Sequence, residues 1–120
     1  MGASNFSNVI MGKYTPSEAY RVLVEDALYE SGHDPYNGTI STTHGFTDLT
    51  KEAPRYGTKA FDKWEDNVLC NDKFGVEKWG RAGLIEISPN TSLFKKMKER
   101  RGLKGRKGVR AFYFFGWAAE

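Results

Sequence analysis

The segment of residues 109–117 constrains the fold most, because it carries β-branched and aromatic residues on both of its alternating faces. It reads Val-Arg-Ala-Phe-Tyr-Phe-Phe-Gly-Trp. A strand with one face in water alternates apolar and polar residues, whereas a strand that is covered on both faces does not. We therefore expect residues 109–117 to form a central strand, with other elements covering both of its sides.

A helix is predicted to begin at Thr15. Thr15 and Glu18 have the spacing of a capping box, in which each side chain bonds to the backbone N–H of the other. Pro16 falls at the first helical position, where its missing N–H has no cost. Apolar residues then recur at three- and four-residue spacing until Gly32, which is expected to cap the helix. The apolar residues are Ala19, Tyr20, Leu23, Val24, Ala27 and Leu28.

The remaining segments predict a small sheet with further helices. We expect a strand at residues 39–43, after a turn at Asn37 and Gly38, and then a loop at 48–57. A helix is expected at 59–69 and a strand at 81–87. Residues 91–101 are expected to form a helix, or alternatively a strand. Residues 1–120 then form a single α+β domain. Its antiparallel or mixed sheet of three to five strands is packed by one long N-terminal helix and one or two short helices.

A homo-oligomer is also predicted. One long helix cannot cover all of the apolar surface that residues 112–115 present. Burial of that surface against another subunit, at about 25 cal/mol per Å², would favour self-association.

The distribution of charge is uneven. The chain has a net charge of +3 and 18 Lys and Arg residues. Nine of these lie at residues 95–110, where Glu99 is the one acidic residue. Within that segment, residues 100–110 combine six cations with three glycines. This composition is typical of a loop that binds an anion.

We predict that five cations of this loop bind phosphate. Glycines allow successive backbone N–H groups to turn inward as an anion-binding nest, and arginine can bind a phosphate through two N–H groups. The segment lacks the pattern of a nucleotide-binding P-loop. The residues are Arg101, Lys104, Arg106, Lys107 and Arg110.

Other interpretations of the same loop remain open. It can be a solvated basic turn, or a basic face that is neutralised by the acidic helix of another subunit through Glu25, Asp26 and Glu30. Attraction to an anionic membrane surface is a further alternative.

A second polar segment is a candidate second wall of the ligand site. Its hydroxyl and imidazole groups suit a ribose or phosphate, and its tyrosine offers a stacking surface. The alternative is an ordinary half-exposed strand. The residues are Tyr36, Thr39, Thr42, Thr43 and His44.

No residue set commits the chain to catalysis, to a metal or to a cofactor. The two histidines, His33 and His44, have no clustered partners of the kind that zinc requires, and the lone Cys70 excludes a disulfide within the chain. No apolar run approaches the ~20 residues of a membrane span, so we expect a cytoplasmic protein without membrane partners. An enzyme that acts on nucleotides with His44 as its base is kept as a third hypothesis.

Three segments together resemble small uncharacterised bacteriophage proteins. They are YESGHDPYNGTISTTHGF at 29–46, DKFGVEKWGRAGLIEI at 72–87 and FYFFGWAAE at 112–120. The resemblance implies an infected bacterial host and an anti-defence role. It carries over no binding residue.

Two functions follow as expectations. The first is a non-enzymatic sponge that sequesters a phosphate-bearing nucleotide signal of host immunity. The second is an anti-CRISPR protein, or another inhibitor that binds nucleic acid or a nucleoprotein through the basic C-terminal loop. The concentrated cations disfavour an acidic mimic of DNA.

Overall fold

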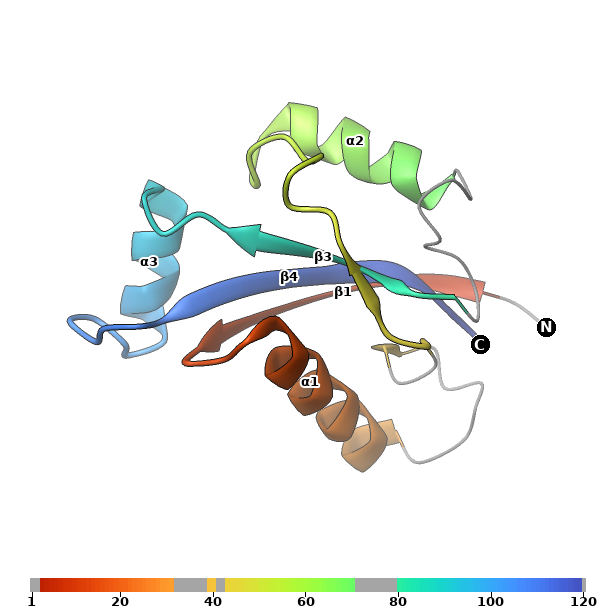
Figure 1. Ribbon diagram of the computed structural model, residues 1–120, viewed down its shortest axis with the longest axis horizontal. Coiled ribbons are helices and arrows are strands. Elements are labelled where there is room, and N and C mark those ends of the chain that lie inside the picture. Colours follow the sequence, from red (N-terminus) through yellow and green to blue (C-terminus); the bar gives the residue numbers. More distant parts are fainter. Residues whose placement is uncertain (1–2, 32–38, 41–42, 71–79, 120) are drawn as a thin grey trace.

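The computed structural model describes residues 3–31, 39–40, 43–70 and 80–119 (Figure 1). The strands in this part of the chain are β1 (Ala3–Gly12), β2 (Phe46–Asp48), β3 (Ala82–Ile87) and β4 (Arg110–Ala119). The helices are α1 (Pro16–Ser31), α2 (Lys59–Leu69) and α3 (Ser92–Arg100). The predicted α+β class is confirmed.

The strands form one mixed sheet in the order β1-β4-β3-β2. β4 is antiparallel to both β1 and β3, and β2 is parallel to β3. Figure 1 shows α1 on one side of the sheet and α2 on the other, with α3 at one end. Separate hydrophobic clusters join the sheet to each helix: Ala19 of α1 belongs to the first, Phe61 of α2 to the second and Phe94 of α3 to the third.

β4 is a central strand that is covered on both faces, as its composition predicts. Phe112 and Phe114 pack in the cluster under α1, whereas Phe115 packs in the cluster under α2. All three side chains are at most 1% exposed. The uncovered apolar surface that led us to expect self-association is therefore not found on β4.

α1 begins as the capping box predicts. The N–H of Glu18 donates to Thr15 Oγ1 at 3.2 Å, and the N–H of Thr15 donates to Glu18 Oε1 at 3.3 Å. The predicted cap, Gly32, lies outside the described residues.

The expectation that this helix is the N-terminal element is wrong, because β1 precedes it. Over residues 3–12, β1 pairs with β4 without interruption. Its composition, with Asn5, Ser7 and Asn8, has low β-propensity, so no local signal marks the strand. Pairing with β4 and burial of Ile10 and Met11 stabilise it instead.

The predicted strand at residues 39–43 is also wrong for its described residues. Thr39, Ile40 and Thr43 lie in bends and a short helical turn, in which both the N–H and the hydroxyl of Thr43 donate to the carbonyl of Ile40. Threonine hydroxyls make such local bonds readily, and these compete with strand pairing. The strand β2 begins after Gly45, at a φ of 106°.

The other expected elements are confirmed. α2 spans residues 59–69 as predicted, and α3 lies within the predicted 91–101. Thr58 and Thr91 cap these helices by accepting hydrogen bonds from the N–H groups of Phe61 and Phe94. β3 and the loop after β2 agree with expectation to within one residue.

Gly83 gives a test of packing between β3 and the α2 face of the sheet. A Cβ at Gly83 would lie 2.6 Å from Cε1 of Phe115, whose ring is 1% exposed. We expect Gly83→Ala to lower the free energy of unfolding by about 1–3 kcal/mol, because the enclosed ring cannot move aside without strain. Urea denaturation measures this change.

Gly105→Ala provides the control for Gly83→Ala. Gly105 has a φ of 81° and no neighbour within 4 Å of an added Cβ, so its replacement tests backbone strain without overpacking. That strain alone costs about 1–2 kcal/mol. If Gly83→Ala proved neutral while Gly105→Ala was destabilising, the close packing of Phe115 on β3 would be contradicted.

A basic lobe and an adjoining aromatic cleft

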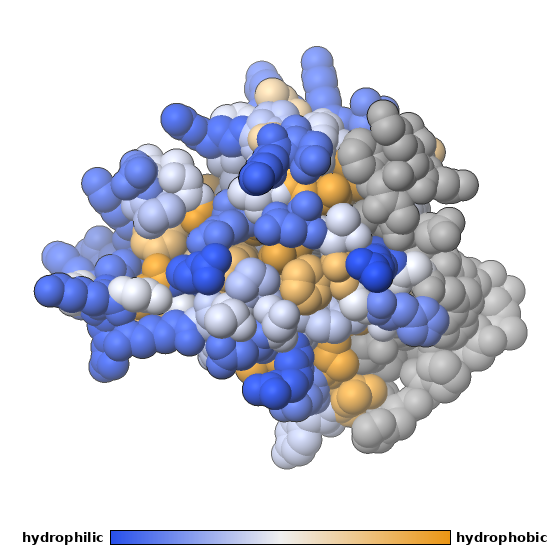
Figure 2. Space-filling view, viewed as in Figure 1, coloured by the Kyte–Doolittle hydropathy of each residue, from blue (hydrophilic) through white to orange (hydrophobic). Residues whose placement is uncertain are grey.

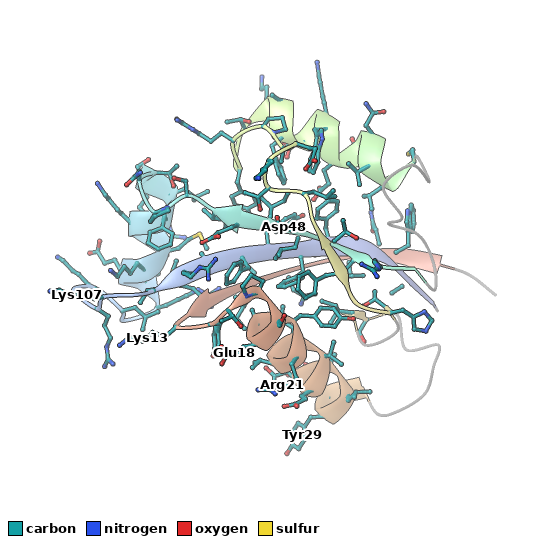
Figure 3. The ribbon with its side chains drawn as sticks, in the orientation of Figure 1. Lys13, Glu18, Arg21, Tyr29, Asp48 and Lys107 are labelled. Carbon is teal, nitrogen blue, oxygen red and sulfur yellow. The ribbon has the colours of Figure 1, made fainter. Side chains whose placement is uncertain are left out.

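The predicted phosphate-binding loop is part of a larger feature, which we call the basic lobe: α3 and the loop that follows it, residues 92–108. It projects from the end of the sheet where β4 begins, and Figure 2 shows hydrophilic residues gathered at that end. Figure 3 shows Lys107 at the tip of the loop, with Lys13 nearby at the end of β1. The charge cluster of the sequence is therefore also a cluster in space.

Eight cations of the basic lobe are available to a ligand. None of them forms an ion pair or a side-chain hydrogen bond with any described residue. Lys98 is half-buried and the other seven are exposed. The eight are Lys95, Lys96, Lys98, Arg100, Arg101, Lys104, Arg106 and Lys107.

The glycines of the loop serve chain reversal. Gly102, Gly105 and Gly108 have φ values of 70°, 81° and 75°. Gly102 ends α3 in a Schellman motif, in which its N–H donates to Glu99 and the N–H of Leu103 donates to Lys98. The N–H groups at this turn therefore bond to helix carbonyls, and they do not form the anion-binding nest that the glycines suggest.

Gly105 occupies a second turn. The N–H of Arg106 donates to the carbonyl of Leu103 at 3.0 Å, and the positive φ of Gly105 fits the third position of a type II turn. The N–H groups of Lys104 and Gly105 bond to no described acceptor, so they remain open to an anion.

Arg110 is separated from the other predicted phosphate ligands. Its guanidinium donates two hydrogen bonds to Glu86, at 2.8 and 2.9 Å, and lies over the ring of Phe112. The hydrogen bonds to Glu86 raise the pKa of Arg110. Phe112 belongs to the face that α1 covers, whereas Arg101 lies on the opposite face. Arg101 and Arg110 therefore do not converge on one phosphate.

Three lysines of the lobe do converge. Lys95 and Lys98 of α3 and Lys104 of the loop line one hollow of about 280 Å³, together with Glu99 and Gly105. Helical spacing of three residues places Lys95 and Lys98 on the same face of α3. Sequence reasoning identified Lys104 and missed the other two, although this helical spacing could have found them.

Arg101 joins the lobe to a second concavity, which we call the aromatic cleft. This cleft has a volume of about 420 Å³ and lies between α2, α3 and the sheet. Figure 2 shows hydrophobic surface between these helices. Its lining residues are Val9, Tyr56, Gly57, Phe61, Asp62, Glu65, Leu93, Met97, Arg101 and Tyr113.

The lining of the aromatic cleft combines stacked rings with carboxylates. Tyr56 and Tyr113 have ring centroids 5.0 Å apart, and Phe61 packs against both. Asp62 and Glu65 of α2 provide acceptors on one side, and Arg101 provides donors on another. The cleft therefore suits a planar ligand with N–H donors at one edge and an anionic group at another.

Glu65 and Tyr113 form a hydrogen-bonded pair within the aromatic cleft. The hydroxyl of Tyr113 donates to Glu65 Oε2. Burial raises the pKa of Glu65, the hydrogen bond from Tyr113 opposes this, and the charges of Asp62 and Asp66 raise the pKa further. Burial and the bond to Glu65 also raise the pKa of Tyr113.

The raised pKa of Glu65 predicts a pH dependence of stability. The contribution of Glu65 to the free energy of unfolding is fully present below its ordinary pKa of 4.5. It is lost as the pH rises through the higher pKa that Glu65 has in the folded state. Glu65→Gln removes this loss, so the stability of Glu65→Gln relative to wild type should increase as the pH rises across that window. Urea denaturation at a series of pH values measures it.

Glu52→Gln is the control for Glu65→Gln, because it removes the same charge at an exposed position outside the cleft. An equal pH-dependent gain in both variants would contradict a specific effect of the cleft on Glu65.

The described residues of the predicted second wall do not lie beside the basic lobe. Thr43 is 8% exposed, and its hydroxyl lies 2.6 Å from that of Tyr20, so it supports α1 against the sheet. His44 is exposed, and its N–H donates to the carbonyl of Gly80 near the start of β3. The lobe lies beyond the other end of β3, which is six residues long.

Of the other second-wall residues, Thr39 is described, and it lines a hollow between α1 and β1. Tyr36 and Thr42 lie outside the described residues. The aromatic wall beside the lobe consists instead of Tyr56 and Tyr113, whose proximity no local sequence pattern predicts.

Among the described residues, no three His, Cys, Asp or Glu side chains gather as a metal site would require. In the same residues, no helix combines the length and the apolar character needed to cross a membrane.

Comparison with known proteins finds no protein family, no curated protein and no solved structure that matches the chain.

Proposed function

We propose that this protein is a non-enzymatic binder of single-stranded nucleic acid. The observation that carries the proposal is the set of eight cations on one projecting lobe that form no ion pair with a described residue, continued by Arg101 into a cleft with aromatic walls. Cations bind the phosphates of a nucleic acid, and aromatic side chains stack on its unpaired bases.

The arrangement of the cations favours an extended ligand. They lie at three places: the hollow formed by three lysines, the tip of the loop at Lys107, and the rim of the aromatic cleft at Arg101. A single nucleotide contacts one such place, whereas a strand of several nucleotides can contact all of them. A double helix has no unpaired base to offer the cleft.

The cleft suggests which bases bind best. Carboxylates only accept hydrogen bonds, so Asp62 and Glu65 select a base edge that carries N–H donors. Guanine offers a ring N–H and an amino group side by side. We therefore expect guanine-containing strands to bind more tightly than strands of thymine.

A nucleotide sponge is the second candidate function. It is favoured by the volume of the aromatic cleft, about 420 Å³, which lies within the range of small-molecule sites. In this version one base enters the cleft and its phosphate contacts Arg101. Either activity suits an anti-defence protein of a phage in its bacterial host: a sponge removes a signal, and a nucleic-acid binder competes for a guide or target strand.

Fluorescence anisotropy with labelled single-stranded and double-stranded oligonucleotides tests the proposal. The logarithm of the affinity for single strands should fall linearly with the logarithm of the salt concentration, by about 0.7 per phosphate contact. Calorimetry with cyclic dinucleotides tests the sponge, and chromatography of the recovered ligand shows whether it is intact. Absence of salt-dependent binding to any oligonucleotide would reject the main proposal, and degraded ligand would identify an enzyme.

A further inference from the structure

β1 forms one edge of the sheet, and its outer side pairs with no other strand of the described residues. All of its residues, Ala3–Gly12, pair with β4 on the inner side. In the described chain, no backbone group of β1 bonds to anything on the outer side. Every second residue of an antiparallel edge strand directs its N–H and C=O outward, so β1 presents a row of unused donors and acceptors.

The strand β1 has none of the features within its own sequence and register that normally protect an edge strand. Proteins protect such edges with charged residues, proline, bulges or very short strands. β1 has ten residues and contains neither a charged residue nor a proline. Its register with β4 is continuous from Ala3 to Gly12, which excludes a bulge.

The opposite edge of the sheet differs. β2 has three residues and ends at the exposed Asp48. A short edge that ends in a charge is protected, so among the described strands β1 is the edge that is open to extension.

We propose that β1 pairs antiparallel with β1 of a second copy of this chain, which joins two four-stranded sheets into one of eight strands. A second copy fits because a twofold axis between two identical strands generates an antiparallel ladder, and because β1 brings no like charges to that ladder. The expected homo-oligomer is thereby a dimer through the sheet edge, and burial of β4 plays no part in it. This inference is independent of the proposed function.

The dimer has a defined arrangement of its surfaces. The twofold axis runs perpendicular to the sheet, so both α1 helices lie on one face and both aromatic clefts open on the other. Val9 of β1 lines the cleft and pairs with Tyr113. The two clefts therefore flank the joint between the subunits.

Carboxylates beside β1 predict the effect of salt. Asp26 and Glu30 of α1 line a hollow with Phe6, and Glu65 lines another with Asn5 on the opposite face. The dimer brings these negative groups closer to their copies. Salt screens that repulsion, so dimerisation should strengthen with salt, whereas binding of nucleic acid should weaken.

The test introduces like charges on the edge. In Asn5→Asp with Ser7→Asp, both replaced side chains are exposed in the monomer, and the two copies bring four carboxylates to one ladder, beside Glu65 of each copy. The matched control is Ser17→Asp with Asn67→Asp, which adds the same charge at exposed positions of α1 and α2. Sedimentation over a range of concentrations gives the mass, and circular dichroism confirms that each variant is folded.

Wild type and the control should sediment with twice the 13.6 kDa of the single chain, and the edge variant with 13.6 kDa. Hydrogen exchange should show concentration-dependent protection at alternate amides of β1. A monomeric wild type at high salt, a dimeric folded edge variant, or a dimer without protection of β1 would each overturn the proposal. Edge pairing with a different protein would give a monomeric wild type.

Discussion

Replacement of Lys95, Lys98 and Lys104 by glutamine should lower the affinity for single-stranded DNA by roughly 100-fold at low salt. The three side chains line one hollow beside the single carboxylate of Glu99, and none of them forms an ion pair with a described residue. If each contributes about 1 kcal/mol to phosphate binding, the loss is about 3 kcal/mol, which corresponds to two orders of magnitude. Fluorescence anisotropy with a labelled oligonucleotide measures it.

The salt dependence distinguishes lost contacts from a change in net charge. Loss of three phosphate contacts should reduce the slope of log affinity against log salt by about 2. The control is the triple replacement of Lys51, Lys59 and Lys63, which removes the same charge from exposed positions outside the basic lobe. Equal losses in the two triple variants would show that the hollow is not a specific site.

Arg110→Gln is a second control for the lobe. Its guanidinium is bound to Glu86, so its replacement should change the affinity by less than the loss of Lys104 alone. The side chain of Arg110 is 40% exposed and that of Glu86 is 32% exposed. An ion pair as exposed as this one contributes only about 0–1 kcal/mol to the free energy of folding.

Phe114→Ala should cost about 3–5 kcal/mol of folding free energy. Phe114 is fully buried in the central strand, and its ring packs against those of Tyr20 and Phe46 at centroid distances of 5.9 and 5.8 Å. Truncation leaves a cavity where α1 and β2 meet the sheet. A domain of this size has about 5–15 kcal/mol of stability, so the variant will be partly unfolded or close to it. Thermal and urea denaturation measure the loss.

Phe6→Ala is the matched control for Phe114→Ala. Phe6 packs against the same cluster but is half-buried on the edge strand β1. Its truncation should therefore cost clearly less. Equal costs at the two positions would contradict the distinction between a covered central strand and a partly open edge.

The elements that the sequence predicts correctly are those with a local physical signal. The aromatic run of β4 indicates a covered strand, and the capping box at Thr15 and Glu18 marks the start of α1. Thr58 and Thr91 precede α2 and α3 as simple N-caps, without the reciprocal bond of a capping box. Each of these signals arises from residues close together in the chain.

The errors occur where contacts distant in sequence decide the structure. β1 is a strand because it pairs with β4, and its polar composition does not predict a strand. The threonines near residue 43 have high β-propensity, but the N–H and hydroxyl of Thr43 bond locally to Ile40, and the hydroxyl also contacts that of Tyr20, 23 residues away. Propensity is overridden by a tertiary contact at β1, and by local bonds together with a tertiary contact at Thr43.

The candidate site was predictable in charge and not in geometry. Counting cations located the basic lobe. The count of cations could not show that Arg110 donates its hydrogen bonds to Glu86. It also could not show that the rings of Tyr56 and Tyr113 pack together beside Arg101. These pairings join residues that are 24 and 57 positions apart, and they depend on the order of the strands in the sheet.

The pairing of Ala3 with Ala119 sets the timing of folding during synthesis. β4 joins β1 to β3, yet it is translated after every other described element. Until a ribosome has released residue 119, β1 and β3 have no strand between them, and α1 has little of the surface that it finally covers. The nascent chain therefore cannot form its sheet during most of its synthesis, and it should fold in one late step. Because the pairing strands are far apart in the sequence, we expect the folding rate to be low.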